Sequence, residues 1–211
     1  CIYSANLKSF IKKKTKNFYY IESKEKGEKI NIKKYLKRKY DFIFSFRNYY
    51  ILRKNLLKKA KYSINFHPST PKYRGSGGVN FAIFNNDKFY GCTCHLMNEK
   101  IDDGNILEAK TFKINKKDNI EKILSKTYKI MFKQAKNIIN LLLKDSENVN
   151  RLVKQNKFKW GKKLTNSKEL FEFYEIKKND SKSKFNKKLI STTFKEFKPY
   201  IKFHGKLFFL E

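Results

Sequence analysis

Residues 40 to 46, YDFIFSF, form a largely apolar and aromatic run that limits the folds open to this chain more than any other segment. Such a run is typical of a strand covered on both faces. The next stretch, NYYILRKNLLKKA, has helical spacing, and SINFH (63 to 67) is predicted to be a second strand. Strand, helix and strand in this order imply a right-handed crossover in a mostly parallel sheet. We therefore predict an α/β fold.

Further elements extend and cover this sheet. VNFAIFNN is predicted to be a helix, and YGCTCHLMN and LEAKTFKI (107 to 114) are predicted to be strands. The clearest helix follows, because Asp118 and Glu121 form a capping-box-like start and apolar residues then recur at intervals of three and four. We expect this helix to pack on the sheet.

The chain opens on a predicted short helix, with Leu7, Phe10 and Ile11 on one face, before a predicted strand NFYYIE (17 to 22). A doubly wound sheet normally opens with a strand. Either the first strand lies before Cys1 and is missing, or the fold is an unusual variant; we favour a missing start.

The pattern of residues along the chain changes from about Glu147. We therefore predict a catalytic domain over residues 1–150 and a small C-terminal α+β subdomain over 151–211. A short helix is expected near Ser167 to Tyr174. The end, YIKF-HG-KLFF, is predicted to be a hairpin that turns at His204 and Gly205. Because a lone hairpin is marginal in water, we expect its apolar residues to be buried, and the tail to serve acceptor binding or self-association as a homodimer.

Size and composition favour one well-buried domain, since the chain has 211 residues and 40% apolar content. No run of eighteen or more apolar residues occurs, and the start CIYSANLKSFIKKKTK carries charges where a signal peptide needs its apolar stretch. Three cysteines are too few and badly placed for a disulfide framework. We predict a cytoplasmic protein with no membrane partner.

The formal charge of +31 ordinarily points to nucleic acid or an anionic membrane. Lysine, however, is spread along the whole chain beside asparagine and isoleucine, which favours dispersed, solvated lysine over a polyanion-binding face. Arginine, the residue suited to bidentate phosphate recognition, supplies five of the 50 basic residues: Arg38, Arg47, Arg53, Arg74 and Arg151. With dispersed lysine or with a polyanion-binding face, the positive charge favours an anionic substrate.

The stretch SINFHPSTP places a carboxamide and an imidazole two positions apart. On a strand, Ser63, Asn65 and His67 line one face, and Pro68 then ends the strand because it has no amide hydrogen. Open α/β sheets place ligands at the carboxyl ends of strands. Asn65 and His67 are therefore candidate site residues, although a core histidine is the alternative.

Gly75, Gly77 and Gly78 precede a predicted helix, where a glycine-rich loop can hold a phosphate. Neither the dinucleotide pattern nor the P-loop ending is present. We favour a tight turn that lets backbone approach a ligand or a helix closely.

Cys92, Cys94 and His95 raise the question of a metal site. On a strand the two cysteines face one way while Thr93 and His95 face the other, so they cannot grip one ion together. We predict buried core cysteines and no metal.

The segment EKIDDGN (99 to 105) concentrates carboxylates in a loop of a basic protein. Taken alone it is best explained as a solvated turn, because Asp-Gly is a turn pair. A carboxylate near His67 would also orient that histidine, raise its basicity and relay a proton.

The run from DFIFSF through INFHPSTPKYRGSGGVNFAIFNN to YGCTCHLMNEKIDDGNIL resembles the folate-dependent formyltransferases, which include methionyl-tRNA formyltransferase, glycinamide ribonucleotide transformylase and the sugar N-formyltransferases. The resemblance covers residues 40 to 145 most strongly. It implies a Rossmann-like catalytic domain that uses 10-formyltetrahydrofolate. The shorter loop after His67 is similar to that of the smaller members, several of which act on amino sugars.

By this resemblance the catalytic residues are Asn65, His67 and Asp102, with Asp103 as the rival by register. Ile101 is then expected to point into the core. The resemblance places the folate beside one loop, and we expect the acceptor to bind along the loop after His67. The folate residues are Phe46, Arg47, Asn48, Tyr49, Tyr50 and Ile51, and the acceptor residues are Ser69, Lys72, Tyr73, Arg74 and Gly75.

Three functions stay open. The leading one is formyl transfer to an amino group of a small anionic acceptor, a nucleotide-linked amino sugar. The second acceptor is initiator methionyl-tRNA, which the net charge favours, although about sixty residues after 150 are few for the second domain of that enzyme. The third is a degraded, non-catalytic relative that acts as a binding module.

Overall fold

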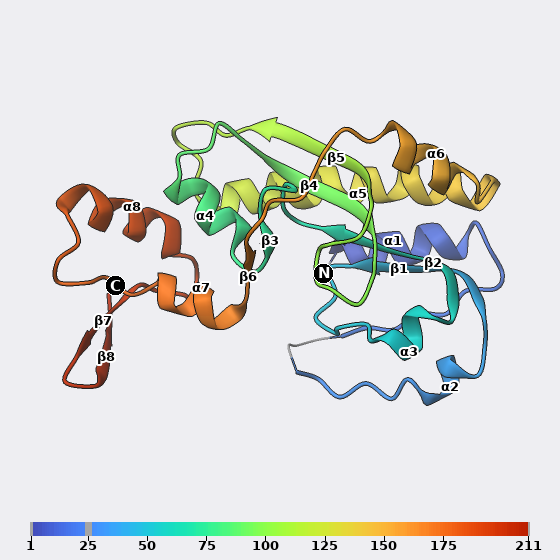
Figure 1. Ribbon diagram of the computed structural model, residues 1–211, viewed down its shortest axis with the longest axis horizontal. Coiled ribbons are helices and arrows are strands. Elements are labelled where there is room, and N and C mark those ends of the chain that lie inside the picture. The colour runs from blue at the N-terminus through green and yellow to red at the C-terminus, as the bar shows by residue number, and fades with distance from the viewer. Residues whose placement is uncertain (1, 24–26, 211) are drawn as a thin grey trace.

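The computed structural model describes residues 2–23 and 27–210, and its centre is a four-stranded sheet in the order β1-β2-β4-β5 (Figure 1). The strands are β1 (Tyr40–Phe46), β2 (Ala60–His67), β4 (Phe89–Leu96) and β5 (Ile106–Lys113). β1 and β2 are parallel, while β4 is antiparallel to both β2 and β5. Three of the four strands thus run in one direction, as a mostly parallel α/β sheet requires, with β4 reversed between them.

Two helices cover one face of this sheet. α5 (Ile120–Lys144) buries one stripe of side chains against β4, and α1 (Ile2–Lys12) packs beside it through Leu7 and Ile11, as predicted. The core between them and the sheet includes Ile64, Phe66, Cys92, Cys94, Met131 and Ile138. The cysteines are therefore core residues, as expected. This packing fixes which face of β2 and β4 is left for a site.

The start of α5 differs from the prediction by one residue. Asn119 is the N-cap, and its side chain accepts a hydrogen bond from the Lys122 amide. Asp118 instead accepts from the Asn115 amide and pairs with Lys126 at 2.6 Å. A carboxamide oxygen caps a helix as well as a carboxylate does, so Asn119 can take the position predicted for Asp118.

Two predicted elements before β2 are wrong. Residues 17–22, which the structure describes, carry no strand: Tyr19 packs edge-on against Tyr35 and Tyr40 without backbone pairing to either. The predicted helix over 48–60 shrinks to α3 (Lys54–Leu57), because the Asn48 side chain bonds the amide and carbonyl of Tyr50 and closes a turn there. α2 (Lys33–Leu36) is a further short helix.

The C-terminal helices α7 (Ser167–Phe173) and α8 (Lys182–Thr192) pack on α4 (Gly78–Phe84), on the left of Figure 1. Phe173 contacts Phe81 and Phe84 at ring distances of 4.7 and 5.1 Å, and the Asn80 amide donates to the Ser191 carbonyl. Before them in the chain, α6 (Asn148–Gln155) packs on β5 and α5, and β6 (Leu164–Thr165) pairs with β3 (Arg74–Gly75). The expected domain boundary at 150 falls inside α6, and the division into two domains stays a prediction.

The closing hairpin is present as β7 (Tyr200–Phe203) and β8 (Lys206–Phe209). His204 and Gly205 have φ of 45° and 75°, the left-handed pair that a two-residue turn needs. The expected burial of its apolar residues is wrong within this chain. Tyr200 is buried, whereas Phe203 is 62% and Phe208 52% exposed.

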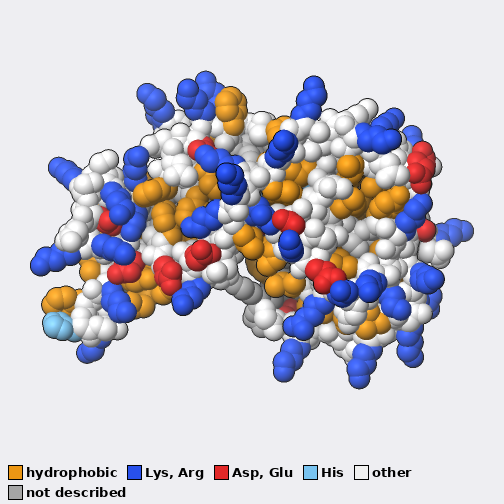
Figure 2. Space-filling model, viewed as in Figure 1, with side chains coloured by type: hydrophobic (Ala, Val, Ile, Leu, Met, Phe, Trp, Pro, Cys, Tyr) orange, Lys and Arg blue, Asp and Glu red, His pale blue; other side chains and the backbone are white. Residues whose placement is uncertain are grey.

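Lysine and arginine side chains are scattered over the face shown in Figure 2, with apolar patches between them. This distribution agrees with dispersed, solvated lysine on that face. Within residues 2–23 and 27–210, every helix is too short or too polar to cross a bilayer. A cytoplasmic location stays a prediction.

Candidate active site

The site begins with the pairing of β2 and β4. Asn65 lies opposite His95, and His67 lies opposite Thr93, so these four side chains share the face that α5 does not cover. The alternate residues of β2, Ile64 and Phe66, point into the core instead. The predicted alternation of β2 is therefore confirmed, and it presents Asn65 and His67 together at the end of the strand.

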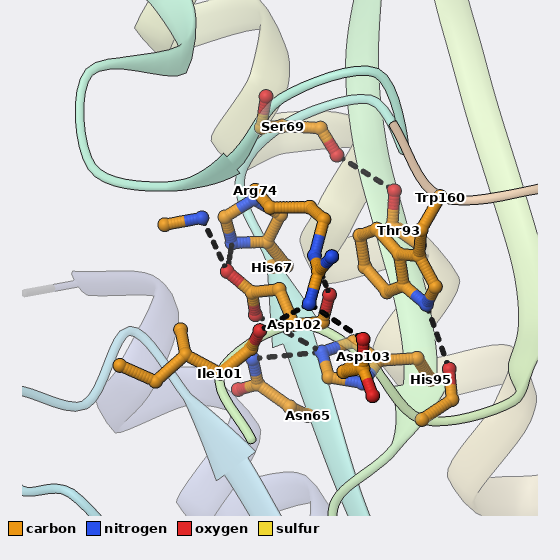
Figure 3. A network of polar contacts seen from close by, with 12 residues as sticks. Asn65, His67, Ser69, Arg74, Thr93, His95, Ile101, Asp102, Asp103 and Trp160 are labelled. Atoms are coloured by element: carbon orange, nitrogen blue, oxygen red, sulfur yellow. Dashed lines mark hydrogen bonds and ion pairs between the residues drawn. The ribbon is translucent and has the colours of Figure 1, made fainter. Parts of the chain in front are cut away.

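Asp102 lies between the two histidines (Figure 3). Its Oδ2 is 3.4 Å from His67 Nδ1, and its Oδ1 is 3.3 Å from His95 Nε2. The Gly75 amide also donates to Oδ2 at 2.8 Å. The carboxylate, which is 7% exposed, therefore joins β2, β4 and the loop after β2 in one polar network.

The loop that carries Asp102 is held from both sides. Arg74 donates from Nε to the Asp102 carbonyl at 2.7 Å and pairs through Nη2 with Asp103 at 2.6 Å. Trp160 donates from Nε1 to the Gly104 carbonyl at 2.7 Å. These bonds keep Asp102 at a φ of 45°, a left-handed conformation that non-glycine residues rarely adopt and that is common at functional sites.

The two neighbouring carboxylates thus have different surroundings. Asp102 points at the histidines, and Asp103 points at Arg74. The expectation that Ile101 points into the core is wrong, because its side chain is 47% exposed. Arg74, and not a buried Ile101, fixes the inward turn of the loop.

Hydrogen bonds and burial set the protonation of the site. Burial lowers the pKa of His67, against the opposing effects of Asp102 and of the Tyr73 carbonyl. Burial raises the pKa of Asp102, but its surroundings, His67 first and the Gly75 amide among them, outweigh burial and bring that pKa to about 2. Asp102 is therefore ionised at neutral pH, and His67 is predominantly neutral.

A neutral His67 ring can satisfy only one of its two neighbours. Nε2 lies 3.0 Å from the Tyr73 carbonyl oxygen and Nδ1 faces Asp102, and both neighbours accept hydrogen bonds. A second ring proton would give each of them a donor. His67 is thus arranged as a base whose protonated form is fully hydrogen-bonded.

Two residues of this site, His95 and Trp160, are not among those predicted from the sequence. His95 follows Cys92 and Cys94 in the sequence, but it alternates with them along β4 and therefore lies on the other face of the strand. Trp160 comes from the segment after α6, and its ring lies 4.9 Å from that of His95 and 6.2 Å from that of His67. No local sequence pattern points to Trp160, because its hydrogen-bond partner Gly104 lies 56 positions earlier in the chain.

The predicted acceptor residues are mostly engaged within the chain. Ser69 is buried, and its carbonyl accepts the Thr93 hydroxyl at 2.7 Å; Lys72 pairs with Asp87 at 2.6 Å. The Tyr73 carbonyl faces His67, while Arg74 and Gly75 hold the Asp102 loop. Gly75 has a φ of 78°, and a Cβ there would lie 2.2 Å from the Thr165 carbonyl oxygen, so it serves a close backbone approach. Their role toward an acceptor stays a prediction.

A cavity of about 1050 Å³ lies along β1 and the loop that follows it. Five of the six predicted folate residues line it, namely Phe46, Arg47, Asn48, Tyr49 and Tyr50, whereas Ile51 is exposed outside it. The loop is shaped by Ser23, which bonds the side chain of Asn48 and the amide of Tyr49. Ser45, the β1 partner of Asn65, also lines the cavity, so cavity and polar network meet at adjacent strands.

A buried carboxylate lies between two imidazoles, with a carboxamide beside them at a strand end, and these are residue types that acid–base chemistry uses. The chain belongs to the formyl transferase family, whose sequence model matches residues 4–133. The resemblance seen in the sequence is thereby confirmed.

Curated relatives match over part of their length. Methionyl-tRNA formyltransferase of Ehrlichia ruminantium is 42% identical over 78 residues, 36% of this chain and 26% of that protein. The bifunctional polymyxin resistance protein ArnA of Wigglesworthia glossinidia brevipalpis is 42% identical over 92 residues, 43% of this chain and 14% of that protein. The matches span about a quarter or less of these relatives.

Solved structures match over more of the chain. A sugar N-formyltransferase from a Shewanella species has a TM-score of 0.73 at 22% identity, covering 99% of this chain and 90% of that chain. An N-formyltransferase from Helicobacter canadensis, solved with folinic acid and dTDP-3-aminofucose, has a TM-score of 0.56 at 22% identity, covering 77% and 58%. These likenesses confirm the predicted Rossmann-like fold class.

Proposed function

We propose that this protein transfers a formyl group from 10-formyltetrahydrofolate to an amino group of a small anionic acceptor, a nucleotide-linked amino sugar. The observation that carries the proposal is the Asn65, His67 and Asp102 cluster at the end of β2, one strand away from a large cavity. The chain's family supports the reaction class.

Each residue of the cluster has a task in this reaction. The acceptor nitrogen bonds to the formyl carbon while the formyl carbon–nitrogen bond of the donor breaks. An Asn65 N–H donates to the formyl oxygen as negative charge develops on it. His67 takes the proton that the acceptor amine loses, and the ionised Asp102 stabilises the imidazolium so formed. The proton then returns to the departing donor nitrogen.

The cavity fits a folate ligand in its chemistry. Its wall carries aromatic rings from Phe46, Tyr49 and Tyr50, and the carboxamide of Asn48. Arg47 adopts a φ of 50°, so the loop turns at this residue. Its guanidinium lies 3.8 Å from the centre of the Tyr128 ring. Bound 10-formyltetrahydrofolate would supply the formyl group; Asn65, His67 and Asp102 supply the hydrogen bonds and the proton acceptor.

The near-complete coverage of a sugar N-formyltransferase structure supports an amino-sugar acceptor. The identity to methionyl-tRNA formyltransferases favours initiator tRNA as the second candidate, and the net charge of +31 agrees with it. A non-catalytic relative is the third candidate, and the contacts of His67 with Asp102 and of Asn65 with His95 count against it.

The proposal includes a homodimer joined through the hairpin β7–β8. Ile201, Phe203 and Phe208 share one face of the hairpin, and each is exposed. Among the described residues, β7 has a neighbour at Tyr200, which pairs with Glu175, whereas β8 pairs with β7 alone. Two copies can pair their β8 edges antiparallel about a twofold axis and bury the same apolar face in both.

The test is an acceptor screen with 10-formyltetrahydrofolate. Nucleotide amino sugars and charged initiator tRNA are offered to the wild type, and formylated product is measured by mass spectrometry. Asn65→Ala and His67→Ala are expected to lose about 100-fold or more in turnover while keeping the wild-type melting temperature. Wild-type turnover in either variant would remove the mechanism, and no product from any acceptor would favour the non-catalytic relative.

A further inference from the structure

His95 lies within the polar network but is outside the assigned Asn65, His67 and Asp102 set. It is 2% exposed, and both of its ring nitrogens have neighbours. Nδ1 lies 2.8 Å from the Leu96 carbonyl oxygen, which can only accept a hydrogen bond. This contact requires a proton on Nδ1, and in the Nδ1–H tautomer of the ring Nε2 has a lone pair.

That lone pair faces the side chain of Asn65. His95 Nε2 is 3.2 Å from Asn65 Nδ2 and 3.3 Å from Asp102 Oδ1. A lone pair accepts from an amide N–H, whereas a carboxylate oxygen offers it no hydrogen. The contact therefore fixes the Asn65 amide with its nitrogen toward β4, since the opposite orientation would set two acceptors against each other. One N–H is used in this contact, and the second stays available to a ligand.

We propose that His95 is a positioning residue, which holds the Asn65 carboxamide nitrogen in its donating orientation through the Nε2 lone pair. The inference rests on the proposed function, because the donated hydrogen bond goes to the reacting formyl oxygen. The ring cannot turn easily: the indole of Trp160 meets it edge to face at 4.9 Å and 89°, and the Leu96 bond holds the other side.

Two matched variants test the contact. In His95→Gln the amide reaches the place of Nε2 and offers an acceptor there, whereas in His95→Asn it reaches only as far as Nδ1. We expect His95→Gln to keep turnover within about tenfold of wild type and His95→Asn to lose on the order of 100-fold, as if Asn65 itself were removed. Because His95 acts through Asn65, adding His95→Asn to Asn65→Ala should cost little more.

A purely structural His95 predicts a different pattern. Both variants would then be equally poor, both would lower the melting temperature, and the loss would add to that of Asn65→Ala. That pattern would overturn the inference.

Nitrogen-15 NMR of the resting protein reads the contact without turnover. We expect a neutral His95 ring protonated at Nδ1, and an Asn65 amide resonance that shifts in His95→Asn but much less in His95→Gln. An imidazolium at neutral pH would overturn the inference, since its Nε2–H would donate to Asp102 and leave Asn65 without that acceptor. If the wild type forms no formylated product, the proposed function fails while this measurement still decides the role of His95.

Discussion

Asp102 and Asp103 are neighbours of the same residue type, yet the fold gives them different partners. Asp102 faces His67 at 3.4 Å, and Asp103 pairs with Arg74 at 2.6 Å. We predict that Asp102→Asn lowers turnover by about 100-fold or more with little change in folate binding, because an amide fills the space but cannot stabilise a protonated His67. The measurement is a pH profile of formyl transfer together with a folate titration.

Asp103→Asn is the matched control for that experiment. Arg74 would still donate to the Asp102 and Ile101 carbonyls, so we expect turnover to stay within about tenfold of wild type. If Asp103→Asn is the variant that loses turnover, Asp103 and not Asp102 is the carboxylate that acts with His67. If neither variant matters, the pairing of His67 with a carboxylate is not catalytic.

Trp160 is expected to set the pH range of the reaction. Its ring shields the two histidines, and burial is the main cause that lowers the pKa of His67. With the neutral His67 imidazole as the proposed base, kcat/KM should fall on the acid side with an apparent pKa below about 6.5. Trp160→Ala lets water reach the ring and should move that acid limb to higher pH, so the variant loses a larger fraction of its activity at pH 6.

Trp160→Phe separates shielding from loop support. It keeps an aromatic cover but removes the hydrogen bond to the Gly104 carbonyl, so the rate should fall while the acid limb moves little. An acid limb at the wild-type position in Trp160→Ala would contradict the shielding role.

For individual residues of the site, the sequence predicted those that local spacing along the chain brings together. The two-residue spacing of Asn65 and His67 on a strand sufficed to place them together, and the resemblance supplied Asp102. His95 reaches the site through the β2–β4 register. Trp160 reaches it from the segment that follows α6 in the chain, through its hydrogen bond to Gly104. Such long-range pairings depend on tertiary packing, which leaves no periodic pattern in the chain.

At the scale of elements, the hairpin β7–β8 carries the sharpest expectation. We predict that Phe208→Glu weakens self-association by roughly tenfold or more, because it puts a charge in the middle of the exposed apolar face formed with Ile201 and Phe203. Sedimentation velocity at several concentrations measures the effect. Leu207→Glu adds the same charge on the opposite face of the hairpin and should leave association intact. A wild type that stays monomeric at every concentration would rule out the dimer.

The predictable elements were those whose own side chains specify both type and environment. β1 is a continuous apolar run, and α5 repeats its apolar residues over 25 positions, so both were found with nearly correct ends. Residues 17–22 have the aromatic composition of a strand, and Tyr19 packs on Tyr40 of the edge strand β1, but among the described residues the two segments form no backbone pairing. Pairing is a property of two segments, so composition alone could not decide it.

For the molecule as a whole, the net charge of +31 is compatible with both acceptors, and salt separates them. A protein that neutralises six to ten phosphates loses about 10³ to 10⁵ in affinity between about 50 and 200 mM salt, because counterions are released. A nucleotide sugar presents two phosphates, so its KM should rise by no more than roughly tenfold over that range. The scattered lysines of Figure 2 agree with the milder response.

We therefore expect kcat to be nearly independent of salt and KM for the amino-sugar acceptor to rise gently, with a shallow slope of log KM against log salt. The same series in potassium chloride and potassium glutamate controls for effects of one anion on the protein. A steep slope with charged initiator tRNA as the better substrate would reverse the acceptor assignment, yet it would leave the roles of Asn65, His67 and Asp102 unchanged. That separation is possible because the three residues lie on β2 and the loop before β5, while lysine and arginine are scattered over the face shown in Figure 2.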